Sequence, residues 1–168
     1  LVYQDKDLFL YENPSFLPRA FFVTNYKILE RNRILEYIIS PNFNPGKEIV
    51  LEEEPEGGIG YWVLGIGCWE SKTDIIDYQP NKVVIEVDAK NDGFLFLSDT
   101  YYPGWSAYID GKKTKIYRAN YCFRAVQINK GEQIIEFKYF PKTFIIGLIG
   151  SVISCIILFI YWRFKCFR

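Results

Sequence analysis

The residues with the clearest chemistry lie between positions 98 and 124. The run from Ser98 to Gly111 reads SDTYYPGWSAYIDG, and a second stretch rich in aromatic and basic residues follows at 118–124. Aromatic rings stack on sugar C–H groups, while carboxylates and guanidinium groups hydrogen-bond hydroxyls. A glycan-binding surface is therefore predicted, with the candidate residues Tyr101, Tyr102, Trp105, Asp99, Arg118, Asn120 and Arg124. The alternative is structural: aromatic packing in the core or a turn, a turn-capping Asp99, and arginines paired with nearby carboxylates.

Catalytic machinery is not visible in the sequence. The chain contains no histidine, which removes the usual general base, the histidine-containing triads and most zinc sites. Asp5-Lys6-Asp7 matches the Asp-x-Asp metal–nucleotide motif of one class of glycosyltransferase, but the same residues suit the turn between two short strands. We therefore expect no catalytic residue, no metal site and no cofactor in this chain.

An apolar run near the C-terminus predicts a membrane helix. Residues 144–162 include 19 positions without a charge. At about 1.5 Å of rise per residue, a helix over this run would be roughly 28 Å long, close to the hydrocarbon thickness of a bilayer. The alternative is a buried core helix. Two pairs of small residues, Gly147 with Ser151 and Gly150 with Ser154, would let other transmembrane helices approach closely.

The charges after this run predict its orientation in a cell membrane. Arg163, Lys165 and Arg168 follow it, and short basic segments stay on the cytoplasmic side. The predicted parts are an extracytoplasmic domain (residues 1–142), a transmembrane helix (143–162) and a cytoplasmic basic tail (163–168). The first part has a net charge of −3 and the tail +3, with no basic face that would suggest nucleic acid as a partner.

Hydrophobic patterning before the apolar run predicts a mainly β domain. Residues 83–88 carry apolar side chains at alternate positions, and 93–97 form a continuous apolar run fit for a strand covered on both faces. Asp110-Gly111 signals a two-residue hairpin, and Pro103-Gly104 suits a type II turn. Apolar spacing over 30–39 predicts one short amphipathic helix. Other strands are expected at residues 1–13 (two short ones), 20–23, 48–51, 105–109, 112–117, 122–128 and 133–140. The whole pattern predicts an antiparallel β-sandwich.

Two features of this predicted domain have two interpretations each. Residues 57–69 are apolar and glycine-rich but too short to span a membrane, which suits either a buried strand or hairpin, or a loop that dips into the outer leaflet. Cys68 and Cys122 are the two cysteines in the predicted extracytoplasmic part. They could form a disulfide or remain two small buried apolar residues.

Several short motifs occur along the chain in a set order. They are residues 11–14 (YENP), 17–21 (LPRAF), 98–111 (SDTYYPGWSAYIDG), 118–121 (RANY), 123–126 (FRAV) and 137–141 (FKYFP). In this order, followed by one last membrane helix, they resemble the C-terminal part of the YfhO-type family of bacterial membrane proteins. Residues 57–69 depart from the family pattern.

The resemblance implies a long multi-pass protein similar to membrane glycosyltransferases of the GT-C type. Such proteins take sugar from a polyprenyl-phosphate donor and are linked to glycosylation of cell-surface polymers such as teichoic acids. Their catalytic carboxylates are expected in an early extracytoplasmic loop, so no catalytic residue is carried over to this chain. Because the sequence starts at Leu1 and contains no Met, we expect a fragment.

The expected function is that of a non-catalytic accessory domain and membrane anchor of such a glycosyltransferase-like protein. Its expected partners are the lipid bilayer, other transmembrane helices of the parent protein, and a cell-surface glycopolymer or lipid-linked sugar. The alternative is a membrane-anchored, non-catalytic glycan-binding or scaffolding module of the cell envelope.

Overall fold

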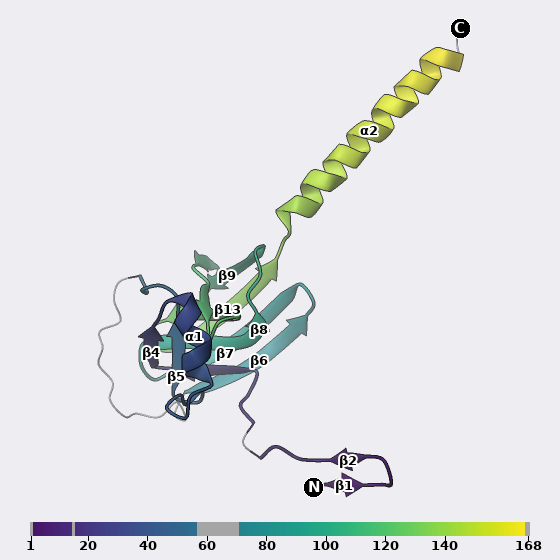
Figure 1. The fold of residues 1–168 in the computed structure, drawn as a ribbon. Helices are drawn as coiled ribbons and strands as arrows, with labels where there is room; N and C mark the ends of the chain where they lie inside the picture. Colours follow the sequence, from purple (N-terminus) through teal and green to yellow (C-terminus); the bar gives the residue numbers. More distant parts are fainter. Residues whose placement is uncertain (1, 15, 57–70, 167–168) are drawn as a thin grey trace.

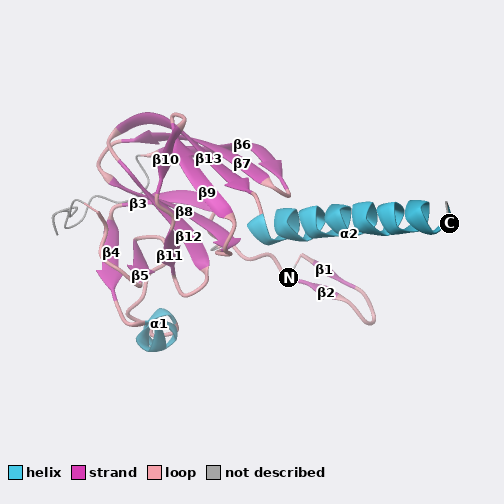
Figure 2. Cartoon of the chain, turned by 90° about the horizontal axis from the view of Figure 1, so that it is seen from above, coloured by secondary structure: helices cyan, strands magenta, loops and turns pink. Residues whose placement is uncertain are grey.

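The computed structural model describes residues 2–14, 16–56 and 71–166. Two β-sheets pack face to face, and a long helix leaves them at the C-terminal end (Figures 1 and 2). The elements are β1 (Tyr3–Gln4), β2 (Phe9–Leu10), β3 (Ala20–Val23), β4 (Asn25–Ile28), α1 (Arg31–Ile38), β5 (Glu48–Leu51), β6 (Lys72–Gln79), β7 (Lys82–Ala89), β8 (Gly93–Thr100), β9 (Trp105–Ile109), β10 (Lys112–Thr114), β11 (Tyr117–Ala119), β12 (Phe123–Ile128), β13 (Gly131–Tyr139) and α2 (Lys142–Cys166).

The two sheets confirm the predicted sandwich. The five-stranded sheet has the order β10-β9-β13-β7-β6, and the six-stranded sheet has the order β3-β8-β12-β11-β5-β4. All pairings in them are antiparallel except β4 with β5, which is parallel. Parallel neighbours need a crossover connection, and the predicted amphipathic helix, α1, lies between these two strands. The sequence patterns indicated the helix but not β4, so the parallel pair was missed.

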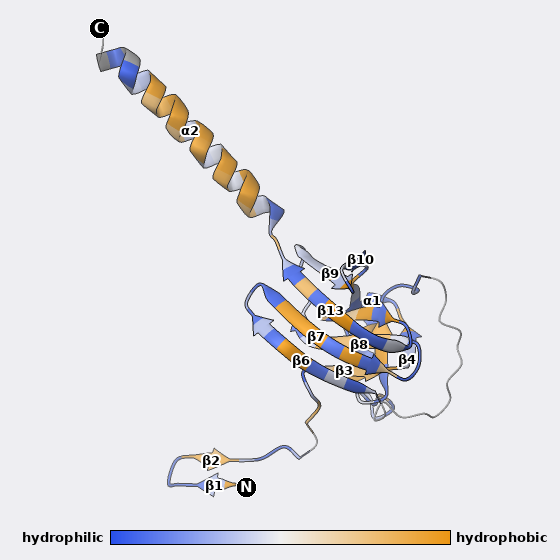
Figure 3. Ribbon diagram, turned by 180° about the vertical axis from the view of Figure 1, so that it is seen from behind, coloured by the Kyte–Doolittle hydropathy of each residue, from blue (hydrophilic) through white to orange (hydrophobic). Residues whose placement is uncertain are grey.

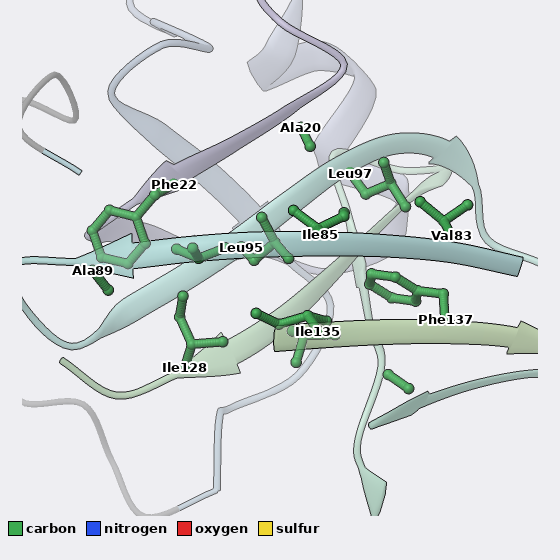
Figure 4. Packing of buried hydrophobic residues seen from close by; sticks show 13 residues of the cluster. Ala20, Phe22, Val83, Ile85, Ala89, Leu95, Leu97, Ile128, Ile135 and Phe137 are labelled. Carbon is green, nitrogen blue, oxygen red and sulfur yellow. The ribbon is translucent and has the colours of Figure 1, made fainter. Parts of the chain in front are cut away.

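The main core lies between the two sheets. Inward-facing side chains of β7, β8, β12 and β13 meet there, among them Ile85, Leu95, Ile128 and Ile135 (Figure 4). Figure 3 shows hydrophobic and hydrophilic residues alternating along β7 and β13, so that hydrophobic side chains face the opposite sheet. Every residue from 93 to 97 is buried, because this part of β8 contributes to the inter-sheet core and to a second apolar cluster. The predicted doubly covered strand is confirmed.

Tight turns connect the strands as the glycine positions predicted. Asp110 and Gly111 both have positive φ, 48° and 79°, and join β9 to β10 as a two-residue hairpin. The turn at Lys130-Gly131 has a different role, because β12 and β13 belong to different sheets and the chain crosses between the layers there. Both turns lie away from the end of β13 at which the C-terminal helix leaves, because Gly131 begins β13 whereas Tyr139, its last residue, pairs with Trp105 at the start of β9.

The N-terminal hairpin stands apart from the sandwich (Figures 1 and 3). Strands β1 and β2 are joined through Asp5, whose N–H donates a 2.9 Å hydrogen bond to the carbonyl of Leu8. The turn interpretation of Asp5-Lys6-Asp7 is therefore confirmed. Several apolar side chains of this arm are exposed: Phe9, Leu10, Tyr11 and Phe16.

Helix α2 is long and apolar enough to cross a bilayer. The stretch Lys142–Arg163 has a mean hydropathy of 2.7, and none of it is buried against the sandwich. Its surface is hydrophobic along almost its whole length (Figure 3). Within the described residues, α2 is therefore not a buried core helix. The predicted segment 57–69 and Cys68 lie outside the described residues, and Cys122 is half-buried.

Candidate functional site

Asp99 is the centre of a hydrogen-bond network between the sheets. It sits near the end of β8, where the buried run of that strand gives way to partly exposed residues. Its carboxylate accepts hydrogen bonds from Arg19 Nη1 at 2.9 Å, from Tyr78 Oη at 3.1 and 3.2 Å, and from Arg124 Nη2 at 2.9 Å. Arg19 Nη1 also donates to Tyr78 Oη at 3.0 Å. The network links β6, β8 and β12 and the residue before β3.

Arg124 is the buried member of this network. Its side chain is 2% exposed, although it carries a full positive charge. The guanidinium carbon lies 4.0 Å from the centre of the Trp105 ring and 5.2 Å from that of Phe137, so two aromatic faces stabilise the cation. Its Nε and Nη1 have no hydrogen-bond partner among the described residues. Burial lowers the pKa of Arg124, against the opposing effect of Asp99.

The pKa of Arg19 shifts in the opposite direction. Its hydrogen bond to the Asp99 carboxylate raises the pKa, and the guanidinium is about half exposed. Asp99 is thus shared between one buried and one exposed arginine. Such an arrangement compensates a buried charge.

Arg118 and Tyr101 form a second, partly exposed group. The guanidinium of Arg118 lies 4.7 Å from the Tyr101 ring centre and 3.6 Å from Glu52 Oε1. Arg31 approaches the same Glu52 oxygen at 3.8 Å. Both arginines keep part of their surface exposed, 26% for Arg118 and 54% for Arg31. This group offers a ring together with hydrogen-bond donors and acceptors to a ligand.

Asn120 has a structural position. It has a φ of 45° and is buried. Its Oδ1 accepts a 2.8 Å hydrogen bond from the N–H of Val50, and its own N–H donates to the Val50 carbonyl at 2.8 Å. The side chain therefore completes the sheet beside β5. Asparagine tolerates the left-handed backbone region better than most residues, which explains its presence at this turn.

The turn at Pro103-Gly104 places Tyr102 and Trp105 beside the start of α2. Gly104 has the predicted positive φ, 111°, and the Trp105 N–H points back to the Tyr102 carbonyl at 3.4 Å. The ring of Tyr139 lies 5.3 Å from Trp105 and 6.4 Å from Tyr102. One residue further on, the N–H of Phe140 donates a 2.9 Å hydrogen bond to the Gly104 carbonyl. This connection fixes the turn beside the start of α2.

A groove of about 950 Å³ opens beside this turn. We call it the lysine groove, because all of its charged lining residues are lysines: Lys82, Lys113, Lys138 and Lys142. Its remaining wall includes Tyr102, Trp105, Tyr108, Tyr139 and Phe140. Tyr102 and Trp105 were among the predicted site residues, whereas the lysines were not. The lysines come from β7, β10, β13 and α2 and meet only in the folded chain.

The seven predicted site residues thus divide into two sets. Asp99, Arg124 and Asn120 are engaged in internal hydrogen bonds, while Tyr101, Tyr102, Trp105 and Arg118 keep some exposed surface. Arg19 and Tyr78 were missed as partners of Asp99. The sequence did contain a signal that Arg124 is buried. Arg124 precedes Val126 and Ile128 at two-residue spacing, which places it on the core face of β12. A buried charge needs a partner of opposite charge. Among the described residues, no group of three or more Cys, Asp or Glu side chains could hold a metal ion.

The fold and the helix define the class of protein. A mainly antiparallel sandwich whose last strand leads within two residues into an apolar helix long enough to cross a bilayer has the architecture of a membrane-anchored domain. The model of the family described as bacterial membrane protein YfhO matches residues 68–151, half of the chain. The chain belongs to this family of bacterial membrane proteins, and the predicted resemblance is confirmed.

One relative shows how much of a family member the chain represents. The chain is 32% identical over 122 residues to the uncharacterized protein YfhO of Bacillus subtilis (strain 168). This alignment covers 71% of the chain but only 14% of that protein. No solved structure matches the chain.

Proposed function

We propose that this chain is the extracytoplasmic domain and last transmembrane helix of a glycosyltransferase-like membrane protein. In this proposal residues 1–142 lie outside the cytoplasm, residues 143–162 span the membrane and the basic tail 163–168 is cytoplasmic. The parent protein transfers sugar from a polyprenyl-phosphate donor to a cell-surface polymer of the teichoic-acid type. The chain contributes no catalytic residue and helps to hold the acceptor polymer.

The observation that carries the proposal is the position of the exposed aromatic residues next to the helix. Tyr101 and Tyr102 lie on the β8–β9 connection, and the Gly104 carbonyl of the same connection accepts the hydrogen bond from Phe140, two residues before α2. Tyr102 is 60% exposed. A sugar ring stacked there would be held at the membrane surface, where the sugar of a lipid-linked donor is also located.

Arg118 supplies the hydrogen-bonding part of the proposed glycan surface. It stacks on Tyr101 and retains free N–H donors, because its contact with Glu52 is a 3.6 Å ion pair with a partly exposed carboxylate. Planar guanidinium groups beside aromatic rings suit polyhydroxylated ligands, which present C–H faces and hydroxyl edges together. Asp99 and Arg124 support the surface from below by holding Trp105.

The first test is polymer binding by the full chain in nanodiscs made of neutral lipid. Tyr102→Ala is expected to weaken binding of purified wall glycopolymer by about 1–3 kcal/mol, roughly 5- to 140-fold, by analogy with ring stacking elsewhere. Tyr11→Ala is the matched control, because Tyr11 is 72% exposed and lies on the N-terminal arm. Equal affinities of the two variants would refute the glycan surface.

A second test uses the parent protein in cells. Deleting residues 1–142 is expected to reduce glycosylation of the cell-surface polymer, with membrane insertion of the remaining protein checked by immunoblot. Unchanged glycosylation in the presence of inserted protein would exclude an accessory role for the domain.

A scaffolding role is the second candidate, and the N-terminal arm favours it. Its apolar side chains, including Phe9, Tyr11 and Phe16, are 51%, 72% and 74% exposed, so the arm has an unburied apolar surface. In this case the domain braces the parent protein. Shortening the arm would then impair the parent while Tyr102→Ala would leave glycosylation unchanged.

A further inference from the structure

The lysine groove has an unusual balance of charge. Four lysines line it, and no aspartate or glutamate does. Two of the lysines are compensated from outside the lining: Lys82 by Asp77 at 3.5 Å and Glu136 at 3.4 Å, and Lys138 by Glu136 at 2.7 Å. Neither of the other two, Lys113 and Lys142, has an ion pair within the described part of the chain. The groove is therefore a net cationic site.

Its place relative to the membrane follows from α2. The apolar helix starts at Lys142, and both Lys142 and Thr143 line the groove. In a bilayer, the polar headgroup layer extends roughly 5–8 Å beyond the hydrocarbon core on each side. A groove whose wall includes the first residues of the spanning helix opens into this layer. With α2 across a bilayer, Lys142 lies at the level of the lipid headgroups, and Lys113 lines the same groove.

The aromatic wall fits the same location. Tyr102 and Phe140 are 60% and 63% exposed, and Trp105, Tyr108 and Tyr139 complete the wall. Tyrosine and tryptophan are enriched at membrane–water interfaces, because their rings are apolar and their edges are polar. A ligand that matches the groove has an anionic group for the lysines and an apolar part that continues toward the bilayer.

We propose that the lysine groove binds the phosphodiester headgroup of an anionic glycerophospholipid in the adjoining leaflet. Lys113 and Lys142 ion-pair with the phosphate, and Tyr139 and Phe140 contact the glycerol and the upper acyl chains. The bound lipid holds the sandwich in one orientation against the membrane. The proposal requires that α2 spans the bilayer, and it is independent of the glycan-binding role and of the side on which the domain lies.

The test is lipid selection by the full chain. The protein is reconstituted in nanodiscs that contain phosphatidylglycerol and phosphatidylcholine in equal amounts, and the lipids retained after gentle release are measured by native mass spectrometry. The wild type is expected to retain phosphatidylglycerol several-fold over phosphatidylcholine. Lys113→Glu is expected to lower this preference by roughly 3- to 10-fold, since each lysine at an anionic surface adds about a factor of five.

Lys112→Glu is the matched control. Lys112 precedes Lys113 on β10, is also exposed, and does not line the groove. Both variants change the net charge by the same amount, so a general electrostatic effect would reduce retention equally. Because Lys113 is exposed and unpaired, its substitution is not expected to unfold the domain, and Lys142→Ala provides a second variant with the same expected loss.

Three results would overturn the proposal. The first is equal retention of the two lipids by the wild type. The second is an equal loss with Lys112→Glu and Lys113→Glu. The third is displacement of phosphatidylglycerol by millimolar inorganic phosphate or by a soluble phosphate-containing wall polymer, which would assign the groove to a soluble anion. The two proposals fail separately. The glycan test measures polymer binding by Tyr102→Ala in neutral lipid, whereas the lipid test measures retention of phosphatidylglycerol by the lysine variants.

Discussion

Replacing Asp99 with asparagine should destabilise the sandwich more than its partial exposure suggests. Asp99→Asn keeps the size of the side chain and removes the negative charge that faces Arg124. The Arg124 side chain is 2% exposed, and the 2.9 Å contact of its Nη2 with Asp99 is its one ion pair among the described residues. The variant therefore leaves a buried cation without a counter-charge.

The expected magnitude follows from this geometry. Removing one partner of a buried ion pair costs about 3–5 kcal/mol. The low end, ~3 kcal/mol, applies here because Asp99 itself is 14% exposed and the Trp105 ring, 4.0 Å from the guanidinium, continues to stabilise the cation. Asp74→Asn is the matched control: its partner Lys72 is 2.8 Å away, but the two side chains are 52% and 79% exposed. The control should lose far less stability, because solvent screens an exposed ion pair.

The assay is urea unfolding of the full chain in nanodiscs, followed by pulse proteolysis of the sandwich. The decisive variant is the double substitution Asp99→Asn with Arg124→Met. Removing the buried cation should restore part of the stability that Asp99→Asn loses, because methionine needs no counter-charge. If the double variant is less stable than Asp99→Asn alone, then the uncompensated charge of Arg124 is not the cause, and the reasoning fails.

Two other predictions concern the Gly104 turn and the carboxylate of Glu136. Gly104→Ala should destabilise the domain by about 2–4 kcal/mol in the same assay, because φ is 111° there and a Cβ would lie 2.9 Å from the Tyr139 ring. The control, Gly111→Ala, should destabilise it by only ~1–2 kcal/mol, because φ is 79° but no atom lies within 4 Å of the added Cβ. Equal losses of stability would contradict the steric argument. The hydrogen bond from Lys138 lowers the pKa of Glu136 below its ordinary 4.5, so its contribution to stability is present above pH 4.5 and is lost as the pH falls through the lowered value. The free energy of unfolding should therefore decrease less between pH 6 and pH 3 for Glu136→Gln than for the wild type. An identical decrease in the two proteins would refute the role of this carboxylate.

Local patterns in the sequence were sufficient for most of the sandwich. The alternation at 83–88, the apolar run at 93–97 and the Asp110-Gly111 hairpin each depend on neighbours along the chain, and each is present in the structure. The parallel pairing of β4 with β5 depends on a crossover through α1, which short-range periodicity does not reveal.

The candidate site was harder to predict for a related physical reason. Arg124 and Arg118 are two of seven polar or aromatic candidates in one region. The alternation along 124–128 places Arg124 on the core face, but it does not identify the residues that Arg124 meets there. The structure places Arg124 between Trp105 and Phe137 and leaves Arg118 at the surface over Tyr101. The lysine groove was beyond reach, since its cations come from four elements that are separated along the chain by as many as 60 residues.

The junction between β13 and α2 limits where the domain can act. Only Phe140 and Pro141 separate the two elements, and two residues span at most about 7 Å. The Phe140 hydrogen bond to Gly104 and the fixed φ of proline restrict this short connection further. The edge of the sandwich at Tyr102 and Lys113 therefore stays close to the membrane end of α2, whereas α1 and the far ends of the sheets project away from it (Figure 1). A ligand that must be held near the membrane would be held at this edge, which is why both the glycan surface and the lipid headgroup site are proposed there.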